Sequence, residues 1–580
     1  MARDPFASMH AVDHDQLLAA ACAELDEQFD PDRCLLESPF TGGPGYHTTL
    51  DPDEVETVHQ TRESLGYALA LLDVGGDGRL DRATEIIDTV LDHQDLDETN
   101  DTYGIWPWYT EEPLTEMAPP DWNWADFCGK RLLLIARRHG DRLPADLCNR
   151  IETAVLAASD AIVERDVGPG YTNIAIMGAF VTIIAGETYD RPDLHEYGIE
   201  RFERFDAHVS RYDAFDEYNS PTYTRVAIVE LGSLATETAT PAVETRADRL
   251  LERAWTMAAT HYHVPTGEWA GPHARSYRTM LSDGIRSFLE VGTNRTIDRI
   301  DPEVIEYDPL WYATDFSCPP TLRSLFAEHA TRGIDDHYGD AADRPLTART
   351  YLTDTYAIGT FDRSSCWNQR RAVVGYAASA DGAVAIRVRM LKDGYDLAAA
   401  QTTAAQCHNR ALVGFNIATD GGDTHISLDG IDGSLDCADL RVRLELEGAT
   451  TAVLLPTATE AAVGNRYSIE LGETTVSCLV PAARFAGREI TTSVVREQDV
   501  EAVDYVLYEG EKRQFELDDI GEAALGLAIA FDEDAAATAT WDTDHLRLDA
   551  DDLGVRIPAA PAPAAYLREH NRATMPPHDA

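Results

Sequence analysis

Lysine is nearly absent from this chain. Only three of its 48 basic residues are lysine, against 101 Asp and Glu, and the formal net charge is −53. A surface of this sign repels nucleic acid and anionic membranes, because both are bound through basic patches. In molar salt the Debye length falls to about 3 Å, so repulsion among acidic groups is screened. The composition therefore predicts a protein of an extreme halophile, such as a haloarchaeon.

Several patterns that define whole protein classes are also missing. The nine cysteines are scattered without a CxxC pair, which argues against a disulfide framework and against a cysteine zinc site. No run of 18 apolar residues occurs and the first residues carry no apolar signal core, so we expect a cytoplasmic protein without a membrane span. P-loop, GxSxG and HExxH motifs are absent from the sequence.

Helical periodicity dominates residues 10–330. Apolar residues recur three and four positions apart, and the connections between periodic segments carry Gly, Pro, Asp and Asn. About ten to twelve helices in consecutive pairs suit a toroid of helical hairpins. The expected helices include 13–28, 53–72, 80–93, 125–139, 145–165, 173–186, 193–210, 221–236, 244–262 and 276–291.

The pattern changes to short β-branched runs near residues 340–350. About a dozen such runs, separated by Gly, Asp and Asn turns, predict stacked antiparallel sheets. The expected fold class is therefore α+β multidomain. It has an N-terminal (α/α) toroid of helical hairpins over 1–340, a C-terminal antiparallel β-sandwich over 341–560, and a flexible Pro/Ala-rich tail over 561–580.

Aromatic residues crowd two loops of the helical half. Aromatic side chains at helix entries can stack on the apolar face of a sugar, or can simply pack helices together. The candidate substrate-binding residues in these loops are Trp106, Trp108, Trp122, Asn123 and Trp124.

Three further segments place polar side chains at expected helix starts. Asn173 lies in the first turn after GPGYT, where its amide could meet a carboxylate or act as a capping residue. Tyr218, Asn219 and Tyr223 crowd a Ser-Pro helix start, either as a proton-transfer group or as packed residues of an ordinary cap.

The last of these segments is a Gly/Pro-rich loop. It carries His273, Arg275 and Tyr277, a set that can act as a base with an anion clamp or lie solvated at the surface.

In this order the segments resemble a known family, the toroid-plus-sandwich polysaccharide lyases. These are the hyaluronan, chondroitin AC and xanthan lyases, with the heparinase II/III-like and alginate lyases as cousins. The resembling segments are DWNWADFCGKRLLLIA, GYTNIAIM, EYNSPTYTRVAI, GPHARSYR and TYLTDTYAIGTFDRSSCWNQR. The family's base histidine has no counterpart in the third segment, where Tyr218 and Asn219 stand instead.

The resemblance implies β-elimination on a uronate-containing poly- or oligosaccharide, without a metal or an organic cofactor. Asn173, helped by Asn219 or Arg275, would neutralise the uronate carboxylate. His273 or Tyr223 would take the C5 proton, and Tyr223 or another acid would protonate the leaving oxygen. Asn173, Tyr223, His273 and Arg275 are thus predicted to converge on one cleft, with the β-domain in support.

Two alternatives stay open at this point. A glycoside hydrolase on a helical toroid would use two carboxylates about 5–9.5 Å apart. Its candidates are Asp121, Asp126, Asp216 and Glu217. A non-catalytic carbohydrate-binding protein would retain the fold without the chemistry.

Overall fold

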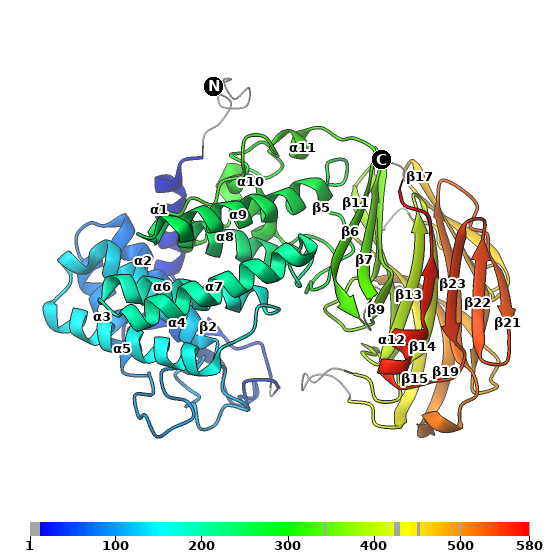
Figure 1. The fold of residues 1–580 in the computed structure, drawn as a ribbon, viewed down its shortest axis with the longest axis horizontal. Coiled ribbons are helices and arrows are strands. Elements are labelled where there is room, and N and C mark those ends of the chain that lie inside the picture. The colour runs from blue at the N-terminus through cyan, green and yellow to red at the C-terminus, as the bar shows by residue number, and fades with distance from the viewer. Residues whose placement is uncertain are drawn as a thin grey trace. The chain divides into compact units, whose positions relative to one another are not determined.

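The computed structural model describes residues 12–43, 45–341, 344–422, 430–448, 453–497 and 500–578. α-Helices fill the first part of the chain and antiparallel strands the second (Figure 1), which confirms the expected α+β multidomain class. The chain divides into two units. The helical unit comprises 1–211, 225–255 and 283–320, and the β unit comprises 212–224, 256–282 and 321–580.

Ten main helices correspond to the ten expected segments within the described residues. They are α1 (His14–Asp26), α2 (Thr61–Val74), α3 (Arg79–Leu91), α4 (Trp124–His139), α5 (Ala145–Arg165), α6 (Thr172–Thr188), α7 (Pro192–Tyr212), α8 (Pro221–Glu237), α9 (Pro241–His261) and α10 (Asp283–Gly292). Consecutive helices pack as hairpins, α2 with α3 and α4 with α5, and α4 also contacts α2 and α6. Because α6 is buried along nearly its whole length, it is the central helix of this unit.

Two helix starts differ from the sequence expectation. Residues 57–60, expected as helix, form β3 (Thr57–Gln60) of a small sheet with β1 (Phe29–Asp30) and β2 (Leu35–Pro39). α10 begins at Asp283, seven positions later than expected, because the preceding loop is held by tertiary hydrogen bonds described below. In both places tertiary pairing overrides local helical periodicity.

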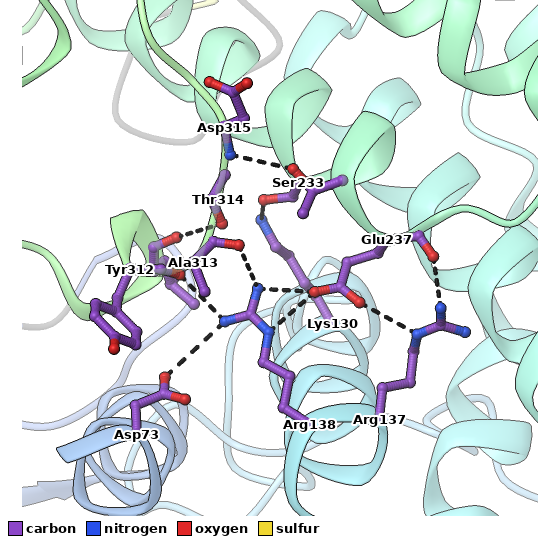
Figure 2. Close-up of polar contacts among 12 residues, drawn as sticks. Asp73, Lys130, Arg137, Arg138, Ser233, Glu237, Tyr312, Ala313, Thr314 and Asp315 are labelled. Carbon is purple, nitrogen blue, oxygen red and sulfur yellow. Dashed lines mark hydrogen bonds and ion pairs between the residues drawn. The ribbon is translucent and has the colours of Figure 1, made fainter.

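An ion-pair network joins the C-terminal ends of α4 and α8 (Figure 2). The guanidinium groups of Arg137 and Arg138 both donate to the Glu237 carboxylate, at 3.2 and 2.8 Å. Arg138 also donates to the Tyr312 carbonyl at 3.2 Å. Cations near helix C-termini and their unpaired carbonyls are electrostatically favourable, so this network fixes how the two helices end.

A buried ion pair crosses the same two helices nearer their centres. Lys130 Nζ lies 2.7 Å from the Glu230 carboxylate and donates to Ser233 at 3.1 Å, and all three side chains are buried. Burial lowers the pKa of Lys130, and Glu230 opposes that shift. One of the chain's three lysines is therefore used as an internal, paired charge.

The β unit is built from three antiparallel sheets, with a two-stranded ribbon of β4 (Tyr262–His263) and β5 (Glu268–Trp269). The largest sheet contains β6 (Arg332–Ala341), β7 (Arg344–Leu352), β8 (Tyr356–Phe361), β10 (Val373–Ser379), β11 (Gly382–Lys392), β12 (Tyr395–Asp396), β15 (Ser434–Gly448), β18 (Thr491–Glu497) and β19 (Val500–Glu516). The second contains β9 (Arg363–Ser365), β13 (Ala400–Cys407), β14 (Arg410–Ile417), β16 (Arg466–Leu471), β17 (Thr474–Phe485) and β20 (Ala523–Phe531). The third contains β21 (Thr538–Trp541), β22 (His545–Ala550), β23 (Leu553–Pro558) and β24 (Arg572–Thr574).

These sheets stack as layers. Inward residues such as Ile386 of β11 and Val413 of β14 share one core between the first two sheets. A second core, with Leu412 of β14 and Val555 of β23, joins the middle and outer sheets. Successive side chains of β14 therefore point into the two different cores, as expected for a strand covered on both faces.

Two expected boundaries require correction. The expected division at residue 340 falls inside β6, which begins at Arg332. The expected flexible tail is structured from 564 to 574, because α12 (Ala564–His570) packs on β23 and β24 pairs with β23. Proline and alanine content could not predict this, because the pairing of β24 with β23 is a tertiary contact. Of the helices in the described ranges, none is long and apolar enough to cross a membrane.

Candidate active site

A phenol pair lies at the start of α8, within the β unit. The hydroxyl groups of Tyr223 and Tyr277 are 2.6 Å apart. Tyr223 is 9% exposed and Tyr277 is 56% exposed, so the pair leads from a buried phenol to solvent. The Ser-Pro sequence sets this position: Pro221 opens the helix, and Ser220 Oγ accepts from the Tyr223 backbone N–H at 3.0 Å.

Arg275 lies over the ring of Tyr223. Its guanidinium carbon is 4.2 Å from the ring centroid, a cation–π distance. Arg275 Nε donates to Gln369 Oε1 at 2.8 Å, and Nη1 donates to Glu217 Oε1 at 2.9 Å. The ring of Trp367 lies 5.7 Å from the same guanidinium. Four side chains thus hold one arginine in a fixed orientation.

The loop that carries Arg275 is bound to the first strands of the β-sandwich. His273 and Arg371 exchange backbone hydrogen bonds of 3.2 and 3.0 Å, and the Ser276 N–H donates to the Gln369 carbonyl at 2.6 Å. A Cβ at Gly359 of β8 would lie 1.9 Å from the Gly271 carbonyl oxygen, so only glycine permits this approach. Gln369 lies in the 350–370 segment singled out above, but only this pairing makes it a site residue.

Burial controls the protonation of Tyr223. Removal from water raises the pKa of this phenol well above its ordinary value, while the charge of Arg275 acts in the opposite direction. Tyr223 is therefore a protonated phenol at neutral pH, and the cation beside it favours its ionised form when a proton leaves.

The structure contradicts His273 as an exposed base. This side chain is fully buried, its Nδ1 lies 2.5 Å from the Asn219 carbonyl oxygen, and its Nε2 is 3.4 Å from the Tyr376 hydroxyl. Burial lowers the pKa of His273 to about 3. Both interpretations of the Gly/Pro-rich loop left the imidazole open to substrate or to solvent, but the pairing of the loop with residues 369–371 covers it.

Tyr218 and Asn219 are also packing residues rather than substrate contacts, because both are fully buried. The Asn219 amide donates to the carbonyls of Ala270 and Pro272 at 2.8 and 3.0 Å and accepts from Trp269 Nε1 at 2.6 Å. The Tyr218 hydroxyl donates to Asp336 at 2.7 Å. These bonds support the loop beneath Arg275, so the two residues position the site.

The aromatic candidates of the helical unit divide into buried and accessible residues. Trp106 is fully buried and its indole N–H donates to the Val90 carbonyl at 3.1 Å, which contradicts a sugar-stacking role. Trp124 is 6% exposed and donates to Thr61 at 3.1 Å. Trp124 is therefore also a packing residue and not a sugar-stacking one.

Trp108, Trp122 and Asn123 are half-buried and retain an accessible surface. Trp108 donates to Asp121 Oδ2 at 3.2 Å, and Trp122 donates to a backbone carbonyl at 3.0 Å. Asn123 accepts from Arg165 at 2.7 Å. Fixed indole orientations of this kind suit stacking on a flat ligand.

Asn173 lies in the first turn of α6, as expected, and is 5% exposed. The fully buried Arg201 donates to the carbonyls of Ile174 and Ala175 beside it, each at 3.3 Å. Asn173 belongs to the helical unit and Tyr223 to the β unit, so their convergence on one cleft stays a prediction.

The hydrolase carboxylates are placed as follows. Asp121 and Asp126 belong to the helical unit, where burial raises the pKa of Asp126 to about 7. Asp216 and Glu217 belong to the β unit, where Glu217 forms the ion pair with Arg275. Glu217 thus has a defined role in holding the arginine.

A family model described as a domain of unknown function, DUF8769, matches residues 27–286. No curated protein matches the chain. Among solved structures, the chondroitin AC lyase of Streptomyces coelicolor A3 in complex with chondroitin sulphate is 12% identical, with a TM-score of 0.48 over 94% of this chain and 85% of that chain.

Two other solved structures are also similar. Heparinase III is 11% identical, with a TM-score of 0.43 over 96% of this chain and 93% of that chain. The endoglucanase CelQ of Clostridium thermocellum is 10% identical, with a TM-score of 0.25 over 89% and 82% of the two chains. At these identities and TM-scores the likenesses assign neither a family nor an activity to this chain.

Proposed function

We propose that this protein is a poly- or oligosaccharide lyase that cleaves uronate-containing glycans by β-elimination. The observation that carries the proposal is the phenol pair of Tyr223 and Tyr277 beneath the guanidinium of Arg275. A buried phenol that ionises beside a fixed cation and exchanges its proton with an exposed hydroxyl is suited to proton transfer on a sugar.

The reaction needs one proton removed and one delivered. Tyr223 first releases its phenol proton toward solvent past Tyr277, and Arg275 stabilises the phenolate that forms. This phenolate takes the C5 proton of the uronate, and the electron pair passes through the enolate to expel the glycosidic oxygen from C4. Tyr223, now protonated, returns the proton to that oxygen. The products are a 4,5-unsaturated uronate and a shortened chain with a new hydroxyl, so atoms and charge balance.

Each remaining residue has a defined task in this scheme. Arg275 stabilises the phenolate through its position 4.2 Å above the ring, and Tyr277 connects the buried phenol to solvent. Asn173 binds the uronate carboxylate and lowers the barrier to enolate formation. Trp108 and Trp122 stack on sugar rings of the bound glycan.

The experiment incubates the purified protein in molar KCl with separate uronate glycans and records absorbance in the ultraviolet band of the 4,5-unsaturated uronate. A lyase produces this chromophore together with new reducing ends. A glycoside hydrolase produces reducing ends alone, and a binding protein produces neither. Reducing ends without the chromophore would refute the elimination mechanism.

A further inference from the structure

A second constellation lies in the helical unit, on the small sheet of β1, β2 and β3. Glu37 pairs directly with His59 across β2 and β3, and Asp30 pairs with Leu35, two positions before Glu37. Directly paired and alternate residues point to the same face of a sheet. The register therefore brings Asp30, Glu37 and His59 together, and their ligand atoms lie within 4.8 Å of one another.

The imidazole of His59 lies between two carboxylates. Its Nδ1 is 2.6 Å from Glu111 Oε1, and its Nε2 is 3.1 Å from Asp30 Oδ2. Glu111 Oε2 also accepts from the His59 backbone N–H at 2.9 Å, so the carboxylate and the ring are held in register. His59 is 6% exposed, and this geometry is fixed from both sides.

A cation on the Nε2 side would complete this arrangement. When Nδ1 carries the proton toward Glu111, the Nε2 lone pair faces a carboxylate oxygen at 3.1 Å. Two lone pairs at that distance repel unless a proton or a metal ion lies between them. A histidine that donates Nδ1–H to a carboxylate and offers Nε2 is the usual form of a metal-bound imidazole.

The local charge balance points in the same direction. Three carboxylates, from Asp30, Glu37 and Glu111, surround one imidazole. Within the described ranges, the ion-pair partner of Asp30 and Glu111 is His59, and neither arginine nor lysine pairs with these acids or with Glu37. Elsewhere in the chain, buried carboxylates such as Glu217 and Asp504 have arginine partners.

We propose that Asp30, Glu37 and His59 bind a divalent first-row transition-metal ion, with Glu111 orienting the imidazole. Mixed imidazole and carboxylate ligands suit Zn²⁺ better than the all-oxygen shells that Ca²⁺ and Mg²⁺ prefer. Zn²⁺ forms bonds of about 2.0–2.2 Å to ligands of these two kinds.

The site has a structural consequence for the aromatic loop. The Thr110 N–H donates to the His59 carbonyl at 3.0 Å, and Tyr109 forms a β-bridge with Gln60. Glu111 follows directly in that loop. A metal ion on His59 would therefore fix the segment that carries Trp108, without itself taking part in the proposed elimination chemistry.

The test measures Zn²⁺ binding to the full-length protein in molar KCl. Chelator-treated wild type and His59→Gln are dialysed against buffered Zn²⁺, and bound metal is quantified. The wild type is expected to hold one Zn²⁺ per chain more than His59→Gln and to melt at a higher temperature with Zn²⁺. Glu111→Gln is expected to retain that ion with about 10–100-fold weaker affinity.

His139→Gln is the matched control, since His139 is a buried histidine with a carboxylate partner, Asp73, at 2.7 Å. It should bind the same number of ions as wild type. Glu37→Gln is a second ligand variant, which keeps the side-chain volume and should weaken Zn²⁺ binding at least 10-fold. It keeps the test decisive if His59→Gln fails to fold. Equal Zn²⁺ content in wild type and both ligand variants would overturn the proposal.

Discussion

Replacing Tyr223 with phenylalanine separates chemistry from packing at the proposed site. The variant keeps the ring 4.2 Å beneath Arg275 and removes one hydroxyl, with its 2.6 Å hydrogen bond to Tyr277. A single hydrogen bond contributes about 0.5–1.5 kcal/mol net, so the free energy of unfolding should fall by about 1 kcal/mol. The loss of general acid–base help should lower kcat by about 10²–10⁴-fold.

The assay follows the initial rate of unsaturated-uronate absorbance over a range of glycan concentrations. Because the hydroxyl acts in the transition state and the ring remains, kcat should fall while KM changes little. Tyr277→Phe is the matched control. It breaks the same hydrogen bond from the other side, so its stability loss should be similar. Its kcat should fall only a few-fold, because Tyr277 is 56% exposed and water can replace its hydroxyl in the proton exchange.

The two variants together can refute the reasoning. If Tyr223→Phe retains more than about a third of wild-type kcat, Tyr223 is not the proton-transfer group, since such a group contributes at least about 100-fold. Equal kcat losses in both variants would indicate that the hydrogen bond matters structurally and that neither phenol reacts. A Tyr223→Phe protein that loses about 1 kcal/mol of stability and at least about 100-fold in kcat supports the assignment.

Three further outcomes are expected. Lys130→Met should lower the free energy of unfolding by about 3–5 kcal/mol, because Glu230 is left as an unpaired buried charge. Denaturant titration in molar KCl measures this loss, and the double variant with Glu230→Leu should recover most of it. Folding lowers the pKa of His273 from 6.5 to about 3. The neutral imidazole therefore contributes fully to the free energy of unfolding above pH 6.5, and this contribution is lost as the pH falls toward 3. The loss amounts to about 2 kcal/mol at pH 5. Denaturation curves should show His273→Asn losing less stability between pH 7 and 5, and an equal loss in both proteins would contradict a neutral buried imidazole. Dilution from molar to about 0.1 M KCl should lower Tm, because the repulsion within a chain of net charge −53 is no longer screened; an unchanged Tm would contradict the halophilic interpretation.

Local periodicity allowed much of the fold to be predicted. Helices α4 and α5 agree with the expected ranges within one residue, because an amphipathic helix of 16 or 21 residues carries several turns of apolar spacing. The β-sandwich could be expected from strand alternation, but the stacking of three layers depends on long-range pairing, as between β13 and β23. The strand at 57–60 and the paired chain end were missed for the same reason.

The candidate site shows where sequence reasoning ends. The Ser-Pro start of α8 and the nearby Tyr223, Arg275 and Tyr277 could be singled out from residue type and spacing alone. Whether a neighbouring side chain faces substrate or the core could not, since His273 and Asn219 are buried only because the 271–278 loop pairs with residues 369–371.

Composition and periodicity by themselves determined the acidic character of the chain, the helix-then-strand order and the chemical types available at each helix start. These properties depend on local sequence, where side-chain preference and spacing act within a few residues. The tertiary structure alone decided which histidines are accessible, that Gln369 holds Arg275, and that Asp30, Glu37 and His59 meet on one face of a sheet. Strand register and burial arise from contacts between segments far apart in the chain, and no local pattern encodes them.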